Sequence, residues 1–280
     1  MQRDLITTAM TNMTNTLSAN DSACRLTILV PVRNEGVNLC IMLKMLRVFV
    51  EVPHEVVVVH DEPDDDSLNV VSELSSALPV RAVHNTHGQG VVNAIRAGIA
   101  AAAGDYVLVF AADEVGPLLA VEDMLALMDQ GCEFVSCTRY AHGGRRLGGS
   151  FFGGVLSRAA NALFHWMAGS KLTDCTTGIK MFRRSQFETV RFESRPVGWS
   201  VAFELAIKAQ LMGLVLGEVP IISIDRLYGG KSTFRVLPWT VEYLRWFFWG
   251  LKQLRMSRPY KGSVLVRVPA STAFGGKARR

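Results

Sequence analysis

Short apolar segments alternate with helical segments over the first half of the chain, and this alternation constrains the fold more than any other feature. Each apolar run is rich in Val, Leu and Ile, and an amphipathic or Ala-rich segment of helical length follows it. Parallel neighbouring strands need such a crossover between them. The pattern therefore predicts an α/β domain with a mostly parallel central sheet flanked by helices. The expected strands are 26–32, 55–61, 80–84, one within 105–114, and 133–138; the expected helices are 37–50, 67–78, 90–103 and 117–130.

The second half is less regular. Six glycines within residues 143–154 predict a flexible loop that leads into a helix at 155–168. A helix is expected at 202–212, and a strand at 214–224 contains Gly217 and Pro220, which favours an edge position or a bulge. The last expected helix spans 237–255.

Composition supports a folded domain with two appendages. The chain has 280 residues, of which 49% are hydrophobic and 20% charged, so it can bury a sizeable core and is not disordered as a whole. Residues 1–23 are rich in Thr, Asn and Ser, lack an apolar signal-peptide core, and are expected to form a mobile arm. We therefore predict an arm at 1–23, a folded domain at 24–234, and an amphipathic helix with a basic tail at 235–280.

The basic character of the chain is concentrated at its end. Nine Lys and Arg residues and no acid follow Glu242, and the formal charge of the whole chain is +5, so residues 1–242 carry +5 − 9 = −4. Such a tail suits an anionic membrane face or nucleic acid, and a merely solvated terminus is the plainer alternative. No run reaches the roughly 18–20 uncharged apolar residues of a membrane span. The five scattered cysteines include no CxxC pair, which favours reduced thiols in a cytosolic compartment and argues against a zinc site.

Acidic residues follow two of the expected strands. Asp113 and Glu114 come directly after the run that begins at Asp105, and Asp61 ends the second strand at the start of a dense acidic turn. Ligands bind outside the carboxyl ends of parallel strands, and hard cations take oxygen ligands. The Asp113–Glu114 segment therefore suits a divalent cation on a nucleotide diphosphate, whereas Asp61 suits hydroxyl or base N–H groups. Plain polar turns and helix capping are the alternatives.

A glycine-rich turn precedes the helix expected at 90–103. Gly88 and Gly90 allow a nucleotide to approach the backbone closely, and the following helix start favours anions. The third glycine of a dinucleotide-binding motif is missing, and the turn follows the third strand instead of the first. Both observations argue against NAD.

Several motifs in order resemble family 2 glycosyltransferases with the GT-A fold, which is Rossmann-like. The resemblance runs from about residue 26 to residue 250, and its branch looks like the dolichol-phosphate mannosyltransferases. The motifs are Val30-Pro-Val-Arg-Asn-Glu35, the acidic turn, Gly88-x-Gly90, Gly104-Asp-Tyr106 leading to Asp113, Thr138-Arg-Tyr140, Thr177-Gly-Ile-Lys180, and Phe203-Glu-Leu205 followed by Gly217-Glu-Val-Pro-Ile221.

The resemblance implies roles for individual residues. Pro31, Glu35 and Asp61 match residues that line the nucleotide pocket, and Asp65 is a looser match. Asp113 matches the last acid of an Asp-x-Asp motif that coordinates Mg²⁺ or Mn²⁺, with Glu114 as a second candidate ligand.

The resemblance also implies residues on the phosphate and acceptor side. Arg139, Lys180 and Arg226 fall at or near positions where basic groups meet phosphate. Glu204 matches an acid near the acceptor, and a structural ion pair is its alternative role.

This sequence departs from the family pattern in two places. The first acid of Asp-x-Asp is Ala111 here, so Asp113 and Glu114 can share one ion only if the strand has already turned, because adjacent strand residues point to opposite faces. In the segment that begins at Arg226 the basic residue has moved by two positions relative to Ser232, and Lys231 is the substitute.

Together these features predict a metal-dependent, inverting transfer of a sugar from a nucleotide diphospho-sugar to a polyprenyl or dolichyl phosphate. Such an acceptor is already ionised and needs no base, and Arg139, Arg158 and Lys180 are expected to position it. For a saccharide hydroxyl acceptor, Asp174 or Glu204 is the candidate base. A catalytically inactive nucleotide-sugar-binding protein stays open because of Ala111.

The expected location is cytoplasmic, with peripheral contact at the inner membrane face. The aromatic last helix suits a bilayer surface with its tryptophans at headgroup level, and packing against the domain or a second subunit is the alternative. Nucleic acid is not expected as a partner, and a homo-oligomer is left open.

Overall fold

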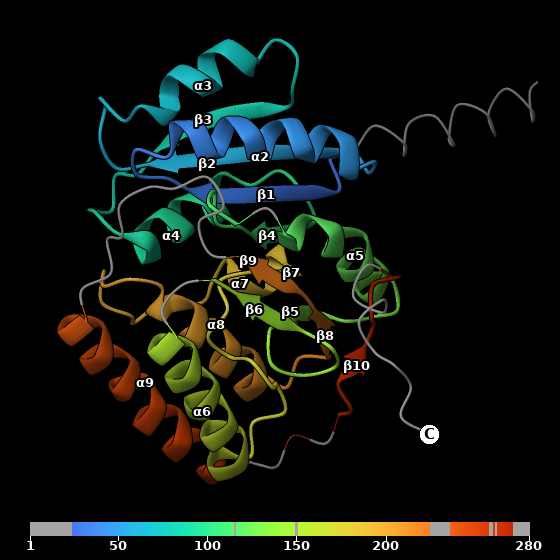
Figure 1. The fold of residues 1–280 in the computed structure, drawn as a ribbon, viewed down its shortest axis with the longest axis vertical. Coiled ribbons are helices and arrows are strands. Elements are labelled where there is room, and N and C mark those ends of the chain that lie inside the picture. The colour runs from blue at the N-terminus through green and yellow to red at the C-terminus, as the bar shows by residue number, and fades with distance from the viewer. Residues whose placement is uncertain are drawn as a thin grey trace, which may run out of the picture.

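The computed structural model describes residues 24–114, 116–148, 151–224, 236–257, 260 and 262–270. The arm predicted at 1–23, Arg226 with its motif, and the end of the basic tail lie outside these ranges. An eight-stranded sheet in the order β10-β8-β5-β7-β4-β1-β2-β3 forms the centre (Figure 1). Its strands are β1 (Leu26–Pro31), β2 (His54–His60), β3 (Val80–His84), β4 (Tyr106–Val109), β5 (Phe134–Thr138), β7 (Lys180–Arg183), β8 (Leu216–Pro220) and β10 (Leu265–Val266).

All neighbouring strands are parallel except β7, which runs antiparallel between β4 and β5. Since β7 opposes both neighbours, β4 and β5 still point the same way. The predicted mostly parallel α/β sheet is confirmed. The antiparallel β7 and the short α7 (Arg184–Phe187) that follows it were not predicted from the sequence.

Helices cover both faces of the sheet because its strands are apolar on both sides. Ile28 and Val30 point to one core and Leu29 to the other. The first core is closed by α2 (Gly36–Phe49), α3 (Ser67–Leu74), the 3₁₀ turn η1 (Gly116–Ala120) and α5 (Val121–Asp129). The second is closed by α4 (Val91–Ala101), α6 (Phe151–Ala168), α8 (Ser200–Leu211) and α9 (Val236–Met256).

Two expectations for the second half were wrong in detail. The loop predicted at 143–154 contains β6 (Arg145–Leu147), and α6 begins four residues earlier than expected, at Phe151. The single strand predicted at 214–224 is split, because the chain leaves the main sheet after Pro220. Its second part, β9 (Ile222–Ile224), pairs with β6 in a separate two-stranded sheet.

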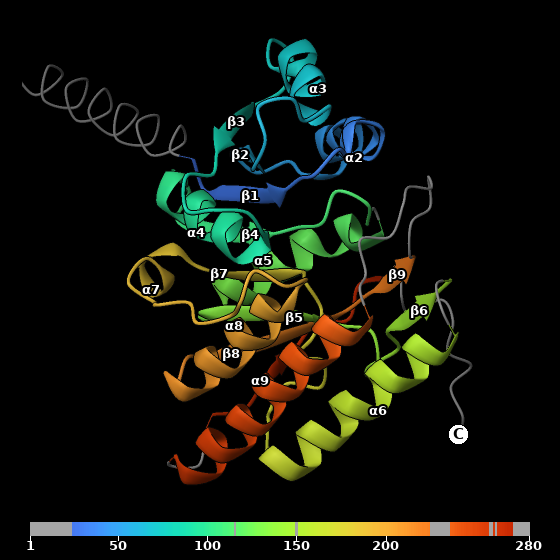
Figure 2. The same ribbon diagram turned by 90° about the vertical axis from the view of Figure 1, so that its left-hand side faces the viewer.

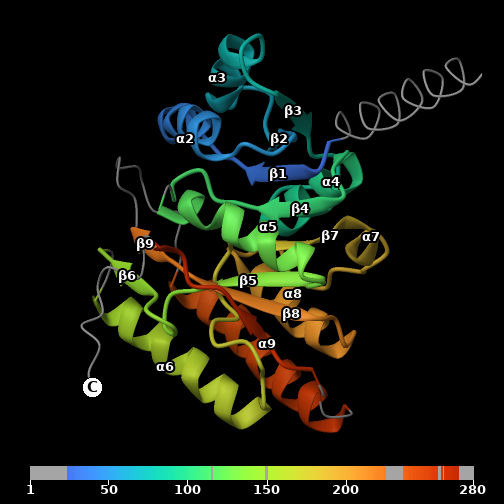
Figure 3. The same ribbon diagram turned by 90° about the vertical axis from the view of Figure 1, so that its right-hand side faces the viewer.

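Helix α8 is buried around almost its whole circumference, with α6 and α9 outside it (Figures 2 and 3). Phe164 of α6 meets Phe203 of α8 edge to face at 4.8 Å between ring centroids and Phe247 of α9 at 5.3 Å. Trp246 of α9 is 1% exposed, so the expectation that the tryptophans of this helix face a bilayer is wrong for that residue: it packs in the core. Among the described residues no helix is long and apolar enough to cross a membrane.

A close backbone approach explains Gly104, which precedes β4. A Cβ atom there would lie 2.6 Å from the backbone nitrogen of Thr27 and 2.7 Å from the carbonyl carbon of Leu26. We expect Gly104→Ala to lower the free energy of unfolding by about 1–3 kcal/mol, because the backbone of β1 must shift. The matched control is Gly154→Ala within α6, where the nearest side-chain atom would be 3.7 Å away. The control should be neutral or stabilising by up to about 1 kcal/mol. Urea unfolding followed by circular dichroism measures both, and equal effects would contradict the packing argument.

Candidate active site

The candidate site lies at the edge of the sheet where the parallel strands end. The carboxyl ends of β1, β2, β4 and β5 meet there, and the amino end of the antiparallel β7 joins them. The polar segments predicted from the sequence all follow these strand ends. Pro31 is the last residue of β1 and pairs with Val59, and Glu35 precedes α2 and accepts a hydrogen bond from the side chain of Asn38 at 2.6 Å.

The acidic turn after β2 caps helix α2. The carboxylates of Asp65 and Asp66 accept hydrogen bonds from the backbone N–H groups of Asn34 (3.0 Å) and Gly36 (2.9 Å), and the Ser67 hydroxyl accepts from Glu35 N–H at 3.1 Å. The first N–H groups of a helix have no partner within the helix. Asp65 is 5% exposed, and its other carboxylate oxygen accepts from Ser67 N–H at 2.9 Å at the start of α3. Asp65 therefore holds the segment before α2 against the start of α3, at the site predicted to hold the nucleotide.

Asp61 fixes the glycine turn. Its Oδ1 accepts from the side-chain amide of Asn85 at 2.7 Å, and its Oδ2 accepts from Gly90 N–H at 2.8 Å. Gly88 and Gly90 have φ angles of +93° and +111°, which L side chains rarely adopt. A Cβ atom on Gly90 would also lie 2.6 Å from Cβ of Pro196. The sequence missed Asn85, whose signal is its place directly after β3, level with Asp61.

The chain turns immediately after β4. Glu114 N–H donates to the Ala111 carbonyl at 3.2 Å, closing a tight turn through Ala112 and Asp113. The strand has therefore already turned, which is the condition for Asp113 and Glu114 to share one ion. The side chains of Asp113 and Glu114 are half-buried. Arg139 follows β5 at the same edge of the sheet, with β7 between β4 and β5.

The Asp113–Glu114 turn fits a cation that is held partly by substrate. No group of three or more His, Cys, Asp and Glu side chains with metal-binding geometry occurs among the described residues. Mg²⁺ usually takes one or two carboxylates, several waters and substrate phosphates, and does not need a protein cage. Two adjacent carboxylates at a strand end match that requirement.

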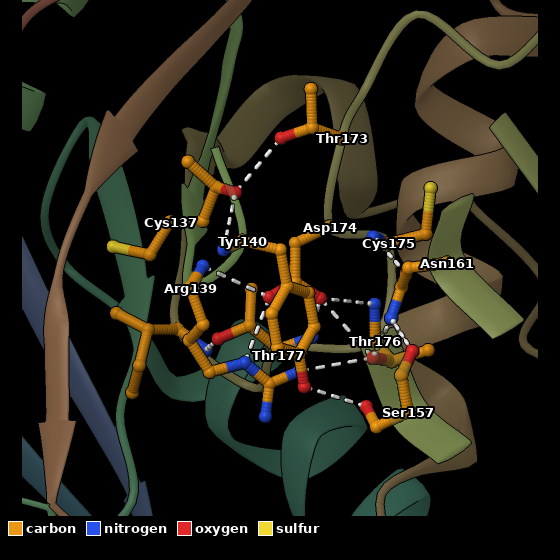
Figure 4. Close-up of polar contacts among 12 residues, drawn as sticks. Cys137, Arg139, Tyr140, Ser157, Asn161, Thr173, Asp174, Cys175, Thr176 and Thr177 are labelled. Atoms are coloured by element: carbon orange, nitrogen blue, oxygen red, sulfur yellow. Dashed lines mark hydrogen bonds and ion pairs between the residues drawn. The ribbon is translucent and has the colours of Figure 1, made fainter. Parts of the chain in front are cut away.

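Arg139, directly after β5, forms a buried ion pair with Asp174 (Figure 4). Nε donates to Oδ2 at 2.8 Å and Nη2 to Oδ1 at 3.0 Å, a two-bond geometry that fixes both groups. Burial alone disfavours both charges, but their mutual attraction outweighs it. The pKa of Asp174 therefore lies below its ordinary value and that of Arg139 above. Both groups stay charged at any physiological pH.

Hydrogen bonds join helix α6 to the segments that contain Arg139 and Asp174. Arg139 also donates to the Thr176 hydroxyl at 3.0 Å, and Thr176 accepts from the side chain of Asn161 in α6 at 2.8 Å. The Tyr140 hydroxyl donates to Ser157, one turn earlier in α6, at 2.8 Å. Figure 4 shows these side chains converging from β5, α6 and the segment before β7. Ser157 and Asn161 were not predicted from the sequence, where only their polarity within a largely apolar helix marks them.

Lys180 lies beneath the site instead of lining it. Its side chain is fully buried and its ammonium donates to the Ser136 hydroxyl at 3.0 Å. Burial lowers its pKa, against the attraction of Cys175 and Asp174. The predicted contact with phosphate requires an exposure that Lys180 does not have in this structure.

Glu204 holds a loop. Its carboxylate accepts from the backbone N–H groups of Glu193 (2.6 Å) and Ser194 (2.8 Å) and pairs with Lys208 at 2.7 Å. Its side chain is fully buried, so this geometry favours the structural ion pair, which was the alternative to a role at the acceptor.

Another buried acid, Glu218 of β8, holds Thr173, the residue before Asp174. It accepts from the backbone N–H of Thr173 at 2.7 Å and from the Thr173 hydroxyl at 3.1 Å, while His142 lies 3.9 Å away. Burial raises the pKa of Glu218 to about 7, against the hydrogen bonds from Thr173. Thr173 is therefore held by the Glu218 carboxyl group, which changes its charge near neutral pH.

Residues 27–191, more than half of the chain, match the family model described as glycosyl transferase family 2. The chain belongs to this family. Two curated relatives agree with the resemblance. A dolichol-phosphate mannosyltransferase of Pyrococcus furiosus is 26% identical over 229 residues, covering 79% of this chain and 64% of the relative. Glycosyltransferase AglD of Haloferax volcanii is 27% identical over 175 residues, covering 60% and 27%.

This family 2 chain thus spans less than two thirds of the length of either relative. Its fold is shared with solved structures. Glucosyl-3-phosphoglycerate synthase from Mycobacterium tuberculosis, in complex with Mn²⁺, UDP and glucosyl-3-phosphoglycerate, superposes with a TM-score of 0.62 at 16% identity, over 86% of this chain and 84% of that one. A complex of the same synthase with Mg²⁺ and UDP gives a TM-score of 0.60 at 17% identity, over 88% and 84%. The predicted GT-A fold is confirmed.

The buried ion pair predicts a large loss of stability when one partner is removed. We expect Asp174→Ala to lower the free energy of unfolding by about 3–5 kcal/mol, because the Arg139 charge loses its partner while its side chain is only 12% exposed. Glu188→Ala, which breaks the exposed Arg184–Glu188 pair, is the control and should cost at most about 1 kcal/mol. Chemical denaturation of both variants measures the difference, and similar losses would argue against a structural role for the pair.

The raised pKa of Glu218 predicts that the free energy of unfolding depends on pH. Its pKa in the folded protein is about 7, above the ordinary 4.5, so the folded state holds the proton more tightly. The contribution of Glu218 to stability is therefore fully present below the ordinary pKa and is lost as the pH rises from 4.5 through 7. Glu218→Gln, which keeps an acceptor for Thr173, should remove a loss on the order of 3 kcal/mol between about pH 5 and about pH 8.

Urea titrations at both pH values test this effect, with Glu188→Gln at the exposed pair as the control. An unchanged pH profile in the Glu218 variant would show that Glu218 does not titrate in this range.

Proposed function

We propose that this chain transfers a sugar from a nucleotide diphospho-sugar to a polyprenyl-type lipid phosphate, in a metal-dependent and inverting reaction. One observation carries the proposal. The Asp113–Glu114 turn after β4, Arg139 after β5 and the Gly88–Gly90 turn after β3 all lie at the edge of the sheet where the parallel strands end. The residues proposed to hold a metal-bound diphosphate and a fixed cation thus share one edge of the sheet.

The proposed binding of the sugar donor rests on the Gly88–Gly90 turn and the Asp113–Glu114 turn. Asp61 holds Gly90 in place, so the backbone there is preorganised for close approach. Asp113 and Glu114 are the residues that would hold Mg²⁺ or Mn²⁺, which when bound supplies positive charge against the leaving nucleotide diphosphate. Solved structures of the same fold contain Mn²⁺ or Mg²⁺ together with UDP.

The proposal of a phosphate acceptor rests on the environment of the two candidate bases, Asp174 and Glu204. Neither carboxylate is available to accept a proton. Asp174 gives both carboxylate oxygens to Arg139, and its lowered pKa makes it a weak proton acceptor. Glu204 is fully buried and bound by Lys208 and two backbone N–H groups. A hydroxyl acceptor needs a base, whereas a phosphate monoester is already ionised near neutral pH. Arg139, held rigidly and permanently charged, is the group that positions that phosphate.

The name of one relative, dolichol-phosphate mannosyltransferase, agrees with a lipid phosphate acceptor. The solved complexes contain phosphoglyceric acid or its glucosyl product, a soluble anionic acceptor. Both kinds of acceptor therefore belong in the test.

The test uses the full chain with UDP-, GDP- and dTDP-sugars and Mn²⁺ or Mg²⁺. A donor that binds should raise the melting temperature by mass action. With that donor, transfer to a polyprenyl phosphate in detergent is expected, and transfer to glucose or 3-phosphoglycerate is not. Asp113→Asn should lower metal-stimulated turnover by about 100-fold or more. Asp105→Asn, at the amino end of the same strand, is the matched control and should keep full activity.

Three results would contradict the proposal in different ways. Full activity of Asp113→Asn would remove the metal role. Product with soluble acceptors alone would replace the acceptor class. Binding of a donor without turnover on any acceptor would indicate an inactive nucleotide-sugar-binding protein.

A further inference from the structure

Two threonines precede the two partners of the buried ion pair, and their hydroxyl groups are hydrogen-bonded to each other. Thr138 comes directly before Arg139, Thr173 comes directly before Asp174, and the Oγ1 atoms of the two threonines lie 2.8 Å apart. This bond joins the same two segments that the ion pair joins, one residue earlier in each. The position of the threonines therefore bears on the direction of the Arg139 side chain.

Glu218 holds Thr173 with both of its carboxylate oxygens. Oε1 accepts from the Thr173 backbone N–H at 2.7 Å, and the Thr173 hydroxyl lies 3.1 Å from Oε1 and from Oε2. The Glu218 side chain is 1% exposed, so water does not compete for these bonds. The hydrogen bonds thus form a chain that runs from Glu218 through Thr173 to Thr138.

The ionisation of Glu218 sets the direction of the hydrogen bonds in this chain. A carboxylate can only accept, so the Thr173 hydroxyl has to donate to it, and the Thr173 oxygen is left to accept from Thr138. A protonated carboxyl group can also donate, so the Thr173 hydroxyl is no longer required to donate to it. Hydrogen bonds to the ionised carboxylate are also the stronger ones. Ionised Glu218 therefore holds Thr173 more firmly than protonated Glu218 does.

Other titratable and charged groups surround Glu218. Ser136 of β5 pairs with Glu218 on one side and with Lys180 on the other, and its hydroxyl accepts from the Lys180 ammonium at 3.0 Å. Arg267, after β10, donates its backbone N–H to the Glu218 carbonyl and turns its side chain to Asp123. Among the described residues, the groups whose charges act on Glu218 are Asp174, Lys180, Cys137, Cys175 and His142.

We propose that Glu218 is a positioning residue for the acceptor phosphate, acting through Thr173 and Thr138 on the Arg139 guanidinium. The ionised carboxylate fixes Thr173, and the bond between the threonines then fixes the backbone from which Arg139 and Asp174 project. The guanidinium is thereby held in the direction that a phosphate requires, a role that rests on the proposed function. Glu218 itself is buried and does not touch the substrate.

This positioning depends on pH. Burial raises the pKa of Glu218 to about 7, so the carboxylate forms, and Arg139 is fixed, as the pH rises through neutrality. The affinity for a phosphate acceptor is then expected to rise, while the contribution of Glu218 to stability is lost over the same range. A residue that only stabilises the fold would not change affinity and stability in opposite directions.

The test measures KM and kcat of the full chain for geranyl phosphate, with Mn²⁺ and the donor that binds. Glu218→Gln keeps the size of the side chain and cannot ionise. At about pH 8 it should raise KM about 5-fold or more, with a smaller change in kcat, because one charge-assisted hydrogen bond is lost. At about pH 5 it should match the wild type, whose Glu218 is then protonated. The acceptor phosphate titrates in every variant, so variants are compared at one pH.

Thr173 provides a second test of the same chain. Thr173→Val removes the hydroxyl and keeps the backbone N–H, and it should also raise KM at about pH 8. The double variant with Glu218→Gln should be no worse than either single variant, because both changes remove the same bond. Thr173→Ser keeps the hydroxyl and should restore a KM close to that of the wild type.

Glu55→Gln is the matched control. Glu55 also accepts from a threonine hydroxyl, that of Thr27 at 2.7 Å, and from a backbone N–H, that of Ala103 at 2.7 Å. It lies near the amino end of β2, at the opposite edge of the sheet from the site. The control should leave KM unchanged at both pH values.

Several results would overturn the proposal. An unchanged KM in Glu218→Gln at about pH 8, or an equal rise in Glu55→Gln, would remove the positioning role. A lower KM in Glu218→Gln would show that the Glu218 charge only repels the phosphate. A pH response of KM that persists in Glu218→Gln and disappears in His142→Asn would assign the titration to His142, whose Nε2 lies 3.9 Å from Glu218.

Failure of the proposed function gives a different result, because calorimetric binding of geranyl phosphate needs no turnover. Weaker binding by Glu218→Gln at about pH 8 only, without transfer to any acceptor, supports the positioning role and removes the reaction. Transfer with the same KM in the wild type and the variants keeps the reaction and removes the positioning role. Absence of binding by the wild type at either pH overturns both.

Discussion

The ion pair between Arg139 and Asp174 is the interaction on which the site depends. It joins the end of β5 to the segment before β7, and through Thr176 and Asn161 it also joins α6. Two charges this deeply buried are tolerated only with full mutual compensation and additional hydrogen bonds. Asp174 meets that condition with two bonds from the guanidinium and further bonds from the backbone N–H groups of Thr176 and Thr177. The pair thereby fixes the direction of a permanent positive charge at the sheet edge.

Three of the acids that the sequence marks as candidates hold loops. Asp61 secures the Gly88–Gly90 turn, Asp65 holds the segment before α2, and Glu204 holds the loop at 193–194. Each of these loops borders the same edge of the sheet. A preorganised site needs such support, because a reacting group displaced by a fraction of an ångström loses much of its effect. Acids with structural roles thus border the same edge of the sheet as the Asp113–Glu114 turn, which we propose holds the metal.

Prediction from the sequence succeeded where the signal is local. The strands and helices up to Thr138 lie within a few residues of their expected positions, because apolar periodicity along the chain directly reflects burial on a sheet or helix face. Prediction failed where contacts between segments far apart in the sequence determine the structure. β6 becomes a strand only because Ile222–Ile224 pairs with it, and the Lys180 side chain is internal because β7 is inserted between β4 and β5. Trp246 and Phe248 have similar apolarity, and only the placement of α8 determines that one is buried and the other exposed.

The sequence by itself determined the α/β alternation, the order of the polar segments after the strands, the family, and the basic character of the end of the chain. These properties follow from residues that are near one another in the chain. The tertiary structure decided which acid pairs with Arg139, which face of α6 stays exposed, and that the chain turns in time for Asp113 and Glu114 to lie together. Those outcomes depend on contacts between segments far apart in sequence, and their energies come from burial and charge pairing that exist only once the sheet has assembled.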